Sequence, residues 1–255
     1  MDSLLASLRE IGREIRETLL RVIGDPDMSA ITGMGADGTY THRIDRVCED
    51  IIIRNVKDLD LPVNVVSEEA GIVDRGYDQN LVTDPLDGTF NAEHRIPFFA
   101  SSMAVMGSDT DSLRLGYVIN LGNGDEYWTE RGGGVFFNGN RVTRKRRANV
   151  VSFNIGDGVE EYIGRLLSLR GKKRALGCAS LELCLVATGS LDMMAYLGNG
   201  NRIRNVDVAA GVLAVRESGG AVVDERGAEF RAGLDVSKRM NIVAVSDRNF
   251  LVDIL

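Results

Sequence analysis

Two segments near the N-terminus repeat apolar residues at helical spacing, and this pattern constrains the fold more than any other feature of the sequence. In the first segment the apolar residues are Leu4, Leu8, Ile11, Ile15, Leu19 and Val22. In the second they are Ile44, Val47, Ile51, Ile52 and Val56. Charged residues fall between them, so the sequence predicts two amphipathic helices that each bury one face against another layer.

Short apolar runs after the second helix predict a sheet. Runs rich in Val, Ile, Thr and aromatic residues lie at 63–66, 81–83, 100–106, 115–119 and 126–129. Asn138-Gly139 is a dipeptide typical of hairpin turns. We therefore predict two helices on a mostly antiparallel sheet for the first half of the chain.

The pattern changes after a basic cluster at 144–147, which we interpret as a solvated linker. Beyond it, helical stretches alternate with strands predicted near 150–155, 174–176, 221–224 and 242–245. This change predicts a boundary near residue 142, with an α+β domain at 1–142 and an α/β domain at 143–255.

Charge and cysteine usage exclude several classes of protein. The 30 Lys+Arg against 37 Asp+Glu give a net charge of -7, which argues against nucleic-acid binding because a phosphate backbone requires a basic face. No apolar run approaches the ~20 residues that cross a bilayer, and the charged N-terminal segment does not read as a signal peptide. We therefore expect no membrane partner and a cytoplasmic location. Cys48, Cys178 and Cys184 have no CxxC spacing, so neither a disulfide framework nor a zinc site is indicated.

Acidic residues stand where predicted strands stop. Glu68 and Glu69 follow VNVVS, and Asp84 and Asp87 follow NLVT. Side chains just beyond neighbouring strand ends project into one crevice. Clustered carboxylates repel one another unless they take up protons or bind cations, and oxygen ligands suit Mg²⁺ or Mn²⁺. We infer a site for such a cation, although any single acid of this kind is more often a solvated cap or turn residue.

The segment DPLDGT, residues 84–89, narrows the chemistry. Pro85 stiffens the turn, Gly88 lets the backbone approach a ligand, and Thr89 supplies a hydroxyl. If a helix starts there, the free amides of Gly88 and Thr89 form an anion site beside the metal. The two aspartates lie three apart, which excludes the DxDxT spacing of haloacid-dehalogenase-type phosphatases, and no twelve-residue loop closing on Glu supports an EF-hand.

Three motifs in a fixed order carry a family resemblance. VVSEEAG, LVTDPLDGTFNAEHRIPFFASSMAV and NVDVAAGVLAVRESGGAVVDERG resemble the inositol monophosphatase family, in particular its archaeal-type members that also act on fructose 1,6-bisphosphate. The resemblance covers nearly the whole chain. It implies the layered α/β/α/β/α sandwich of the sugar phosphatases, with the active site between the two halves, and a homodimer.

The resemblance also implies a set of metal ligands. Glu68, Asp84 and the carbonyl of Leu86 would hold one divalent cation, and Asp84, Asp87 and Asp207 would hold a second. A third, weaker cation would lie near residues 35–39, although for Asp37 taken alone an exposed, flexible loop is the interpretation that we prefer. The cofactor implied is Mg²⁺, two or three per site, with Mn²⁺ as an alternative.

The remaining site residues come from the same resemblance. Glu69 would orient a metal-bound water, and Asp45 with Thr89 would accept its proton, although Asp45 could instead be a charged residue on a helix face. Asp87, Gly88 and Thr89 would bind the phosphate. Gly177 and Cys178 would lie at the substrate pocket. Arg174, Arg202 and Arg204 would suit a second phosphate, unless they are surface salt-bridge partners.

These features predict an Mg²⁺-dependent phosphomonoesterase that hydrolyses fructose 1,6-bisphosphate and inositol 1-phosphate, with direct attack by a metal-activated water and no covalent phosphoenzyme. An alternative keeps the site and changes the substrate to 3′-phosphoadenosine 5′-phosphate. A catalytically silent scaffold is disfavoured, because Glu68, Asp84, Asp87 and Asp207 are all present.

Overall fold

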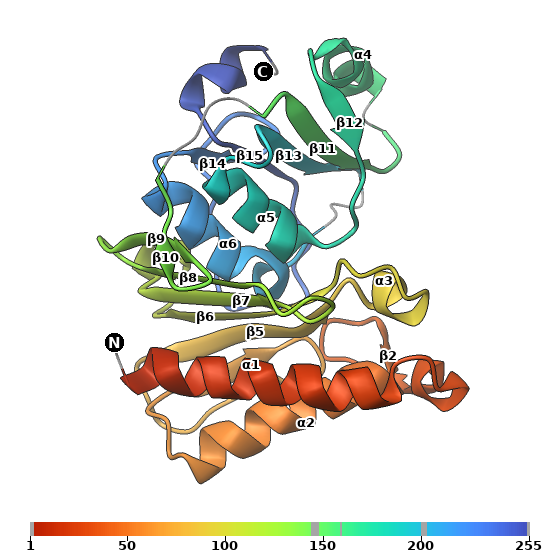
Figure 1. Cartoon of the computed structure of the whole chain (residues 1–255), viewed down its shortest axis with the longest axis vertical. Coiled ribbons are helices and arrows are strands. Elements are labelled where there is room, and N and C mark those ends of the chain that lie inside the picture. The colour runs from red at the N-terminus through yellow and green to blue at the C-terminus, as the bar shows by residue number, and fades with distance from the viewer. Residues whose placement is uncertain (1–2, 144–147, 159, 200–202, 254–255) are drawn as a thin grey trace.

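The computed structural model describes residues 3–143, 148–158, 160–199 and 203–253. Helices and sheets alternate in five layers along the long axis (Figure 1). From the bottom of that view these layers are α1 with α2, an eight-stranded sheet, α5 with α6, a five-stranded sheet, and α4. The predicted α/β/α/β/α sandwich is confirmed.

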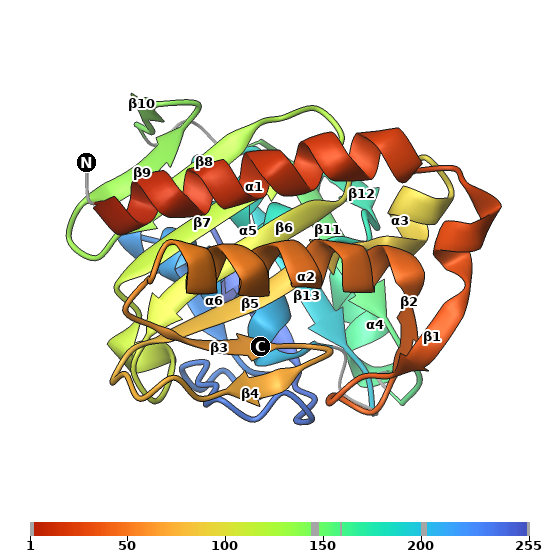
Figure 2. The ribbon, with the colours of Figure 1, turned by 90° about the horizontal axis from the view of Figure 1, so that it is seen from below.

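The two predicted amphipathic helices form the outer layer on the N-terminal side. Helices α1 (Ser3–Val22) and α2 (Arg43–Asp58) lie side by side across one face of the large sheet (Figure 2). Their apolar faces and that side of the sheet form one buried core. At Gly12 a Cβ atom would lie 2.7 Å from Cε1 of Tyr117, so a glycine is needed where α1 crosses the sheet.

The eight-stranded sheet is antiparallel except for one pair of strands. Its order is β10-β9-β8-β7-β6-β5-β3-β4, and only β3 and β5 run parallel. The Asn138-Gly139 dipeptide forms the turn between β9 and β10, as predicted. The strands are β3 (Asn64–Ser67), β4 (Gly71–Val73), β5 (Asn80–Asp87), β6 (Ala100–Met106), β7 (Leu115–Asn120), β8 (Glu126–Glu130), β9 (Gly134–Phe137) and β10 (Asn140–Arg141).

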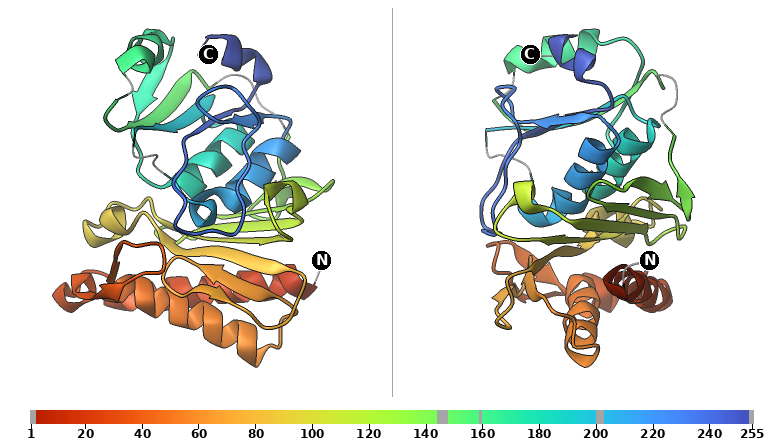
Figure 3. Two further views of the ribbon diagram at one scale, coloured as in Figure 1. Left: turned by 180° about the vertical axis from the view of Figure 1, so that it is seen from behind. Right: turned by 90° about the vertical axis from the view of Figure 1, so that its left-hand side faces the viewer.

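The second half of the chain supplies the other three layers. The five-stranded sheet has the order β12-β11-β13-β15-β14, and Figure 3 shows α5 and α6 enclosed between the two sheets. These elements are β11 (Val150–Ile155), α4 (Glu160–Ser168), β12 (Lys172–Arg174), α5 (Ala179–Thr188), β13 (Met193–Leu197), α6 (Asn205–Glu217), β14 (Ala221–Val223) and β15 (Ile242–Val245). The strand predicted near 174–176 thus begins and ends two residues earlier.

Smaller elements complete the chain. A hairpin of β1 (Ile31–Met34) and β2 (Tyr40–His42) lies between the first two helices, and the short α3 (Thr89–Glu93) follows β5. Three 3-10 turns are η1 (Pro26–Ser29), η2 (Thr110–Ser112) and η3 (Arg248–Asp253). Among the described residues no helix is long and apolar enough to cross a bilayer.

The predicted boundary near residue 142 stays a prediction. Each sheet takes its strands from one side of that position. The layer of α5 and α6 nevertheless packs against both sheets, so the two halves share one large core. The basic cluster at 144–147 lies outside the described residues.

Candidate active site

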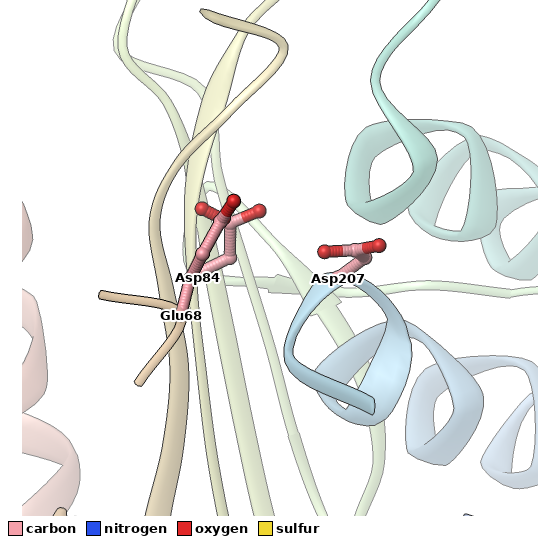
Figure 4. Close-up of side chains that lie close together, drawn as sticks. All are labelled: Glu68, Asp84 and Asp207. Carbon is pink, nitrogen blue, oxygen red and sulfur yellow. The ribbon is translucent and has the colours of Figure 1, made fainter. Parts of the chain in front are cut away.

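Three carboxylates from distant parts of the sequence converge at one edge of the large sheet. Glu68 follows β3, Asp84 lies in β5, and Asp207 lies in the first turn of α6. One oxygen of each carboxylate lies within 4.8 Å of the others (Figure 4). Because β3 and β5 are parallel, their carboxyl ends reach the same edge, which is why Glu68 and Asp84 meet there.

A β-bulge brings Asp87 to the same side as Asp84. In a regular strand residues three apart point to opposite faces. In β5, however, Asp84 pairs with Ser102 and Asp87 with Ala100, so three steps on β5 match two on β6. The extra residue reverses the alternation between Asp84 and Asp87, a stretch that contains Pro85, whose ring nitrogen has no proton to donate to the neighbouring strand.

Asp87 also ties the site to α5. Its Oδ2 accepts a hydrogen bond of 2.7 Å from the backbone N–H of Ser180, and the thiol of Cys178 lies 3.2 Å away. The next residue, Gly88, adopts φ +88°, and a Cβ there would lie 3.3 Å from Cys178. Gly88 therefore serves both the left-handed turn and the close approach of α5.

Asp45 and Thr89 are in direct contact. The Thr89 hydroxyl lies 2.9 Å from Oδ1 of Asp45 and 3.1 Å from the carbonyl oxygen of Leu86. The other Asp45 oxygen accepts a bond of 3.2 Å from the backbone N–H of His42, at the start of α2. Asp45 is therefore held at the site and is not a free residue on a helix face.

Glu69 and the loop at residues 35–39 form the wall of the site nearest β3. The Thr41 hydroxyl donates to Glu69, and the backbone N–H groups of Ala36 and Asp37 donate to the carbonyls of Glu69 and Glu68. At Gly35 a Cβ would lie 2.5 Å from Oε2 of Glu69, so a side chain there would displace the Glu69 carboxylate.

Our interpretation of Asp37 as an exposed loop residue is wrong. Its side chain is 0% exposed, and its Oδ2 lies 2.7 Å from both Nη1 of Arg204 and Nη2 of Arg239. The Thr39 backbone N–H donates to the other oxygen over 2.8 Å. Sequence reasoning missed Arg239 altogether, because no local pattern connects it with a residue 202 positions away.

Arg204 lies among the carboxylates and not on an open surface. Its guanidinium contacts Glu68, lies 2.9 Å from Asp207 and 4.0 Å from Asp84, and its side chain is 16% exposed. This position differs from the one expected for a residue that faces a second phosphate. The reason is electrostatic, since the acidic cluster is the strongest partner within reach of a cation at the start of α6.

The packing of these carboxylates raises their pKa values. Burial, followed by the charge of Glu68, raises the pKa of Asp84 well above its usual value. Burial also raises the pKa of Glu68 to about 8, against the opposing effect of Arg204, and that of Asp87 to about 6, with Asp207 contributing. Burial likewise raises the pKa of Glu69 to about 6 and that of Asp45.

These residues suit a hard divalent cation. The donors are carboxylate oxygens, burial and then neighbouring negative charge raise the pKa of Asp84, and a guanidinium already lies between the carboxylates as a cation. Such a site favours Mg²⁺ or Mn²⁺ chemistry over that of softer metals.

The predicted substrate residues lie in different surroundings. Cys178 is buried, whereas Gly177 and Arg174 are exposed. The backbone N–H of Gly177 donates to Oε1 of Glu182 over 3.0 Å, which holds this loop on α5, and Nη1 of Arg174 donates to the carbonyl of Lys173 over 2.8 Å. Arg202 lies outside the described residues.

Comparison with known proteins agrees with this architecture. The model of the inositol monophosphatase family matches residues 2–251. A fructose-1,6-bisphosphatase/inositol-1-monophosphatase from Thermococcus kodakarensis is 37% identical over 95% of this chain and 92% of its own length. A bifunctional NADP phosphatase/NAD kinase from Methanococcus maripaludis is 29% identical over 97% of this chain but 48% of its own length.

Among solved structures, an inositol monophosphatase-fructose 1,6 bisphosphatase has a TM-score of 0.89 and 29% identity, covering 100% of this chain and 99% of its own. Fold and site together define a phosphoric monoester hydrolase of the sugar-phosphatase type. The chain belongs to the inositol monophosphatase family.

Proposed function

We propose that this protein is an Mg²⁺-dependent phosphomonoesterase that hydrolyses fructose 1,6-bisphosphate and inositol 1-phosphate. The observation that carries the proposal is the convergence of Glu68, Asp84 and Asp207 within 4.8 Å. The names of the archaeal relatives support the two substrates.

The proposed metal ligands are those that the family resemblance implies, and the cluster of Glu68, Asp84 and Asp207 supports them. Glu68, Asp84 and the carbonyl of Leu86 would hold one cation, and Asp84, Asp87 and Asp207 a second, with a third near the loop at 35–39. When bound, the cations would screen the phosphate charge and lower the pKa of the water that attacks phosphorus.

Side chains of the protein would accept the proton from the attacking water, and backbone amides would bind the phosphate. Thr89 donates its hydroxyl proton to Oδ1 of Asp45, so the oxygen of Thr89 can accept a proton from the attacking water. Thr89 would then pass its own hydroxyl proton to Asp45, and the raised pKa of Asp45 suits it to receiving that proton. Glu69 would orient the water, and the amides of Gly88 and Thr89, with Asp87 beside them, would hold the phosphate.

Substrate selectivity would come from the rim of the site. Arg174 is exposed, and among the described residues Nη1 is the only nitrogen of its guanidinium with a hydrogen bond. Together with Arg202 it is proposed to bind the second phosphate of fructose 1,6-bisphosphate, with Gly177 and Cys178 forming the pocket floor.

Phosphate release from a panel of sugar, inositol and nucleotide phosphates, with Mg²⁺, with Mn²⁺ and with EDTA, tests the proposal. We expect hydrolysis of both named substrates with Mg²⁺ and none with EDTA. Hydrolysis that continues in EDTA would contradict the metal requirement. A matched control is Asp50→Asn on α2, which removes an exposed carboxylate away from the cluster and should leave activity unchanged.

A nucleotide substrate is the second candidate. The relative named as an NADP phosphatase supports it, since this substrate is a nucleotide phosphate like 3′-phosphoadenosine 5′-phosphate. Faster release from either nucleotide than from the sugar phosphates would favour it. The homodimer and the cytoplasmic location also remain proposals, and sedimentation of the purified chain tests the former.

A further inference from the structure

Arg204 occupies the centre of the acidic cluster. Its Nη1 lies 2.7 Å from Oδ2 of Asp37 and also contacts Oε1 of Glu68. Its Nη2 lies 2.9 Å from Oδ1 of Asp207 and 4.0 Å from Oδ2 of Asp84. One guanidinium therefore contacts or approaches four carboxylates, three of which form the metal-ligand cluster.

The guanidinium contacts oxygen atoms of two of the three clustered carboxylates, Glu68 and Asp207. Oδ1 of Asp207 accepts a hydrogen bond of 3.0 Å from Nε of Arg204 and also lies 2.9 Å from Nη2. A divalent cation bound to these carboxylates would lie within a few ångströms of the guanidinium in a largely buried site, so the two positive charges would repel each other and compete for the same carboxylates.

We propose that Arg204 is an internal cation that fills the acidic cluster when no metal is bound and that Mg²⁺ displaces it, with Asp37 retaining the displaced guanidinium. This inference rests on the proposed function only in requiring that the cluster binds a divalent cation. In this proposal Arg204 lowers the affinity of the cluster for the metal, and Asp37 is a positioning residue that holds Arg204.

The surroundings of both residues suit this exchange. The backbone N–H of Arg204 donates to Oδ2 of Asp207 over 2.8 Å, so the start of α6 stays in place and only the guanidinium must move. Asp37 is anchored by Thr39 and by Arg239, independently of Arg204. It can therefore keep a bond to the guanidinium while Nη2 and Nε leave Asp207 and Nη1 leaves Glu68.

Competition of this kind lowers the apparent metal affinity. The metal binds only the fraction of molecules in which the cluster is open, so the apparent dissociation constant rises as that fraction falls. Removing the internal cation should open the cluster in every molecule. It should also leave the carboxylates of the metal-free protein without their counter-charge and so destabilise that state.

The test is a titration of the metal-stripped full chain with Mn²⁺ in the absence of substrate. The electron paramagnetic resonance signal of free Mn²⁺ measures how much of the metal is bound. We expect Arg204→Gln to bind Mn²⁺ on the order of tenfold more tightly than the wild type. Arg204→Lys keeps the positive charge but lacks the planar guanidinium, so its affinity for Mn²⁺ should lie between those of the wild type and Arg204→Gln. The matched control is Arg231→Gln, because Arg231 is 68% exposed and paired with Asp111 away from the cluster.

A double-mutant cycle tests the role of Asp37. In the wild type, Asp37→Asn should weaken Mn²⁺ binding, because Arg204 then loses the partner outside the cluster that would hold its displaced guanidinium. In the Arg204→Gln background the same change should have a much smaller effect. Equal effects in both backgrounds would reduce Asp37 to a general negative charge and overturn that part of the inference.

The outcomes separate this inference from the proposed function. If Arg204→Gln does not fold, Arg204→Lys alone decides, and binding equal to or weaker than that of the wild type in the folded variants overturns the exchange. Such a result would leave the phosphatase proposal standing. Absence of Mn²⁺ binding in the wild type would instead overturn both.

Discussion

The hydroxyl of Thr89 lies 2.9 Å from Oδ1 of Asp45, and this contact joins the first turn of α3 to the first turn of α2. The two residues are 44 positions apart and belong to different helices. Because the pair borders the metal ligands through the carbonyl of Leu86, it lies where a proton acceptor would be needed.

The first prediction concerns that pair. Asp45→Asn keeps the shape of the side chain but cannot take up a proton, so kcat should fall by about 10² to 10⁴-fold. Mg²⁺ affinity and thermal stability should change little, because Asp45 is not proposed as a ligand. Steady-state kinetics beside metal titration check this, and near wild-type kcat would remove Asp45 from the reaction.

The second prediction concerns Asp87. Asp87→Asn should abolish hydrolysis, since it removes a proposed metal ligand. This carboxylate also accepts the backbone N–H of Ser180 in the first turn of α5, and the amide oxygen of asparagine can accept the same bond. Because asparagine caps helices about as well as aspartate, we expect the fold to stay intact, with a free energy of unfolding of the metal-free protein no lower than that of the wild type. Urea unfolding measures it, and retained turnover would contradict the assignment.

The third prediction concerns Glu68. Glu68→Gln should sharply raise the Mg²⁺ concentration needed for half-maximal activity, because a neutral amide is a poorer ligand for a hard cation. Titration of activity with Mg²⁺ measures the change. Glu17→Gln, an exposed change on α1, is the control. A superimposable titration curve for Glu68→Gln would exclude it as a ligand.

The fourth prediction is a pH dependence of the metal-free protein. The pKa values of Asp87, about 6, and of Glu68, about 8, are higher than the ordinary values of 3.8 and 4.5 that the unfolded chain would show. The folded state therefore binds more protons between about pH 4 and 8, and its free energy of unfolding should fall as the pH rises through that window. Melting temperatures in EDTA should fall accordingly.

Added Mg²⁺ should reverse that trend at the upper end of the window, because it binds the ionised carboxylates and stabilises the folded state. The same melting series repeated with Mg²⁺ checks this. Parallel curves with and without Mg²⁺ would argue against binding at these carboxylates.

The fifth prediction separates the two proposed substrates. Arg174→Ala should remove a charge-assisted contact of about 1.5–3 kcal/mol with the second phosphate, which is about ten- to hundredfold in kcat/KM for fructose 1,6-bisphosphate. Inositol 1-phosphate has no second phosphate and should be affected far less. Equal losses on both substrates, or none on either, would reject this role for Arg174.

Much of the site could be predicted because its parts are local in sequence. The apolar runs that precede Glu68 and Asp84, and the glycine that allows a left-handed turn after Asp87, can be recognised in short stretches of the sequence. The bulge that turns Asp84 and Asp87 to one side could not be predicted, since it depends on how β5 pairs with β6. A register is a property of two strands and not of one.

Asp37 and Arg204 show most clearly what could not be predicted from the sequence. In sequence Asp37 stands in a loop of small polar residues typical of an exposed turn, and Arg204 in a stretch rich in glycine and asparagine. They are 167 positions apart, yet their side chains lie 2.7 Å from each other. Nothing in the sequence around either residue indicates that the other lies beside it.

The sequence was sufficient for the helices, most strands, the layered fold and the identity of the acidic residues, because hydrophobic periodicity and turn chemistry act over a few residues. Only the tertiary structure decided which charges meet. The packing of α6 between the two sheets brings Arg204 and Asp207 to the edge where β3 and β5 end. Electrostatic partners are chosen by proximity in the folded chain, and that proximity is set by the burial of all the layers together.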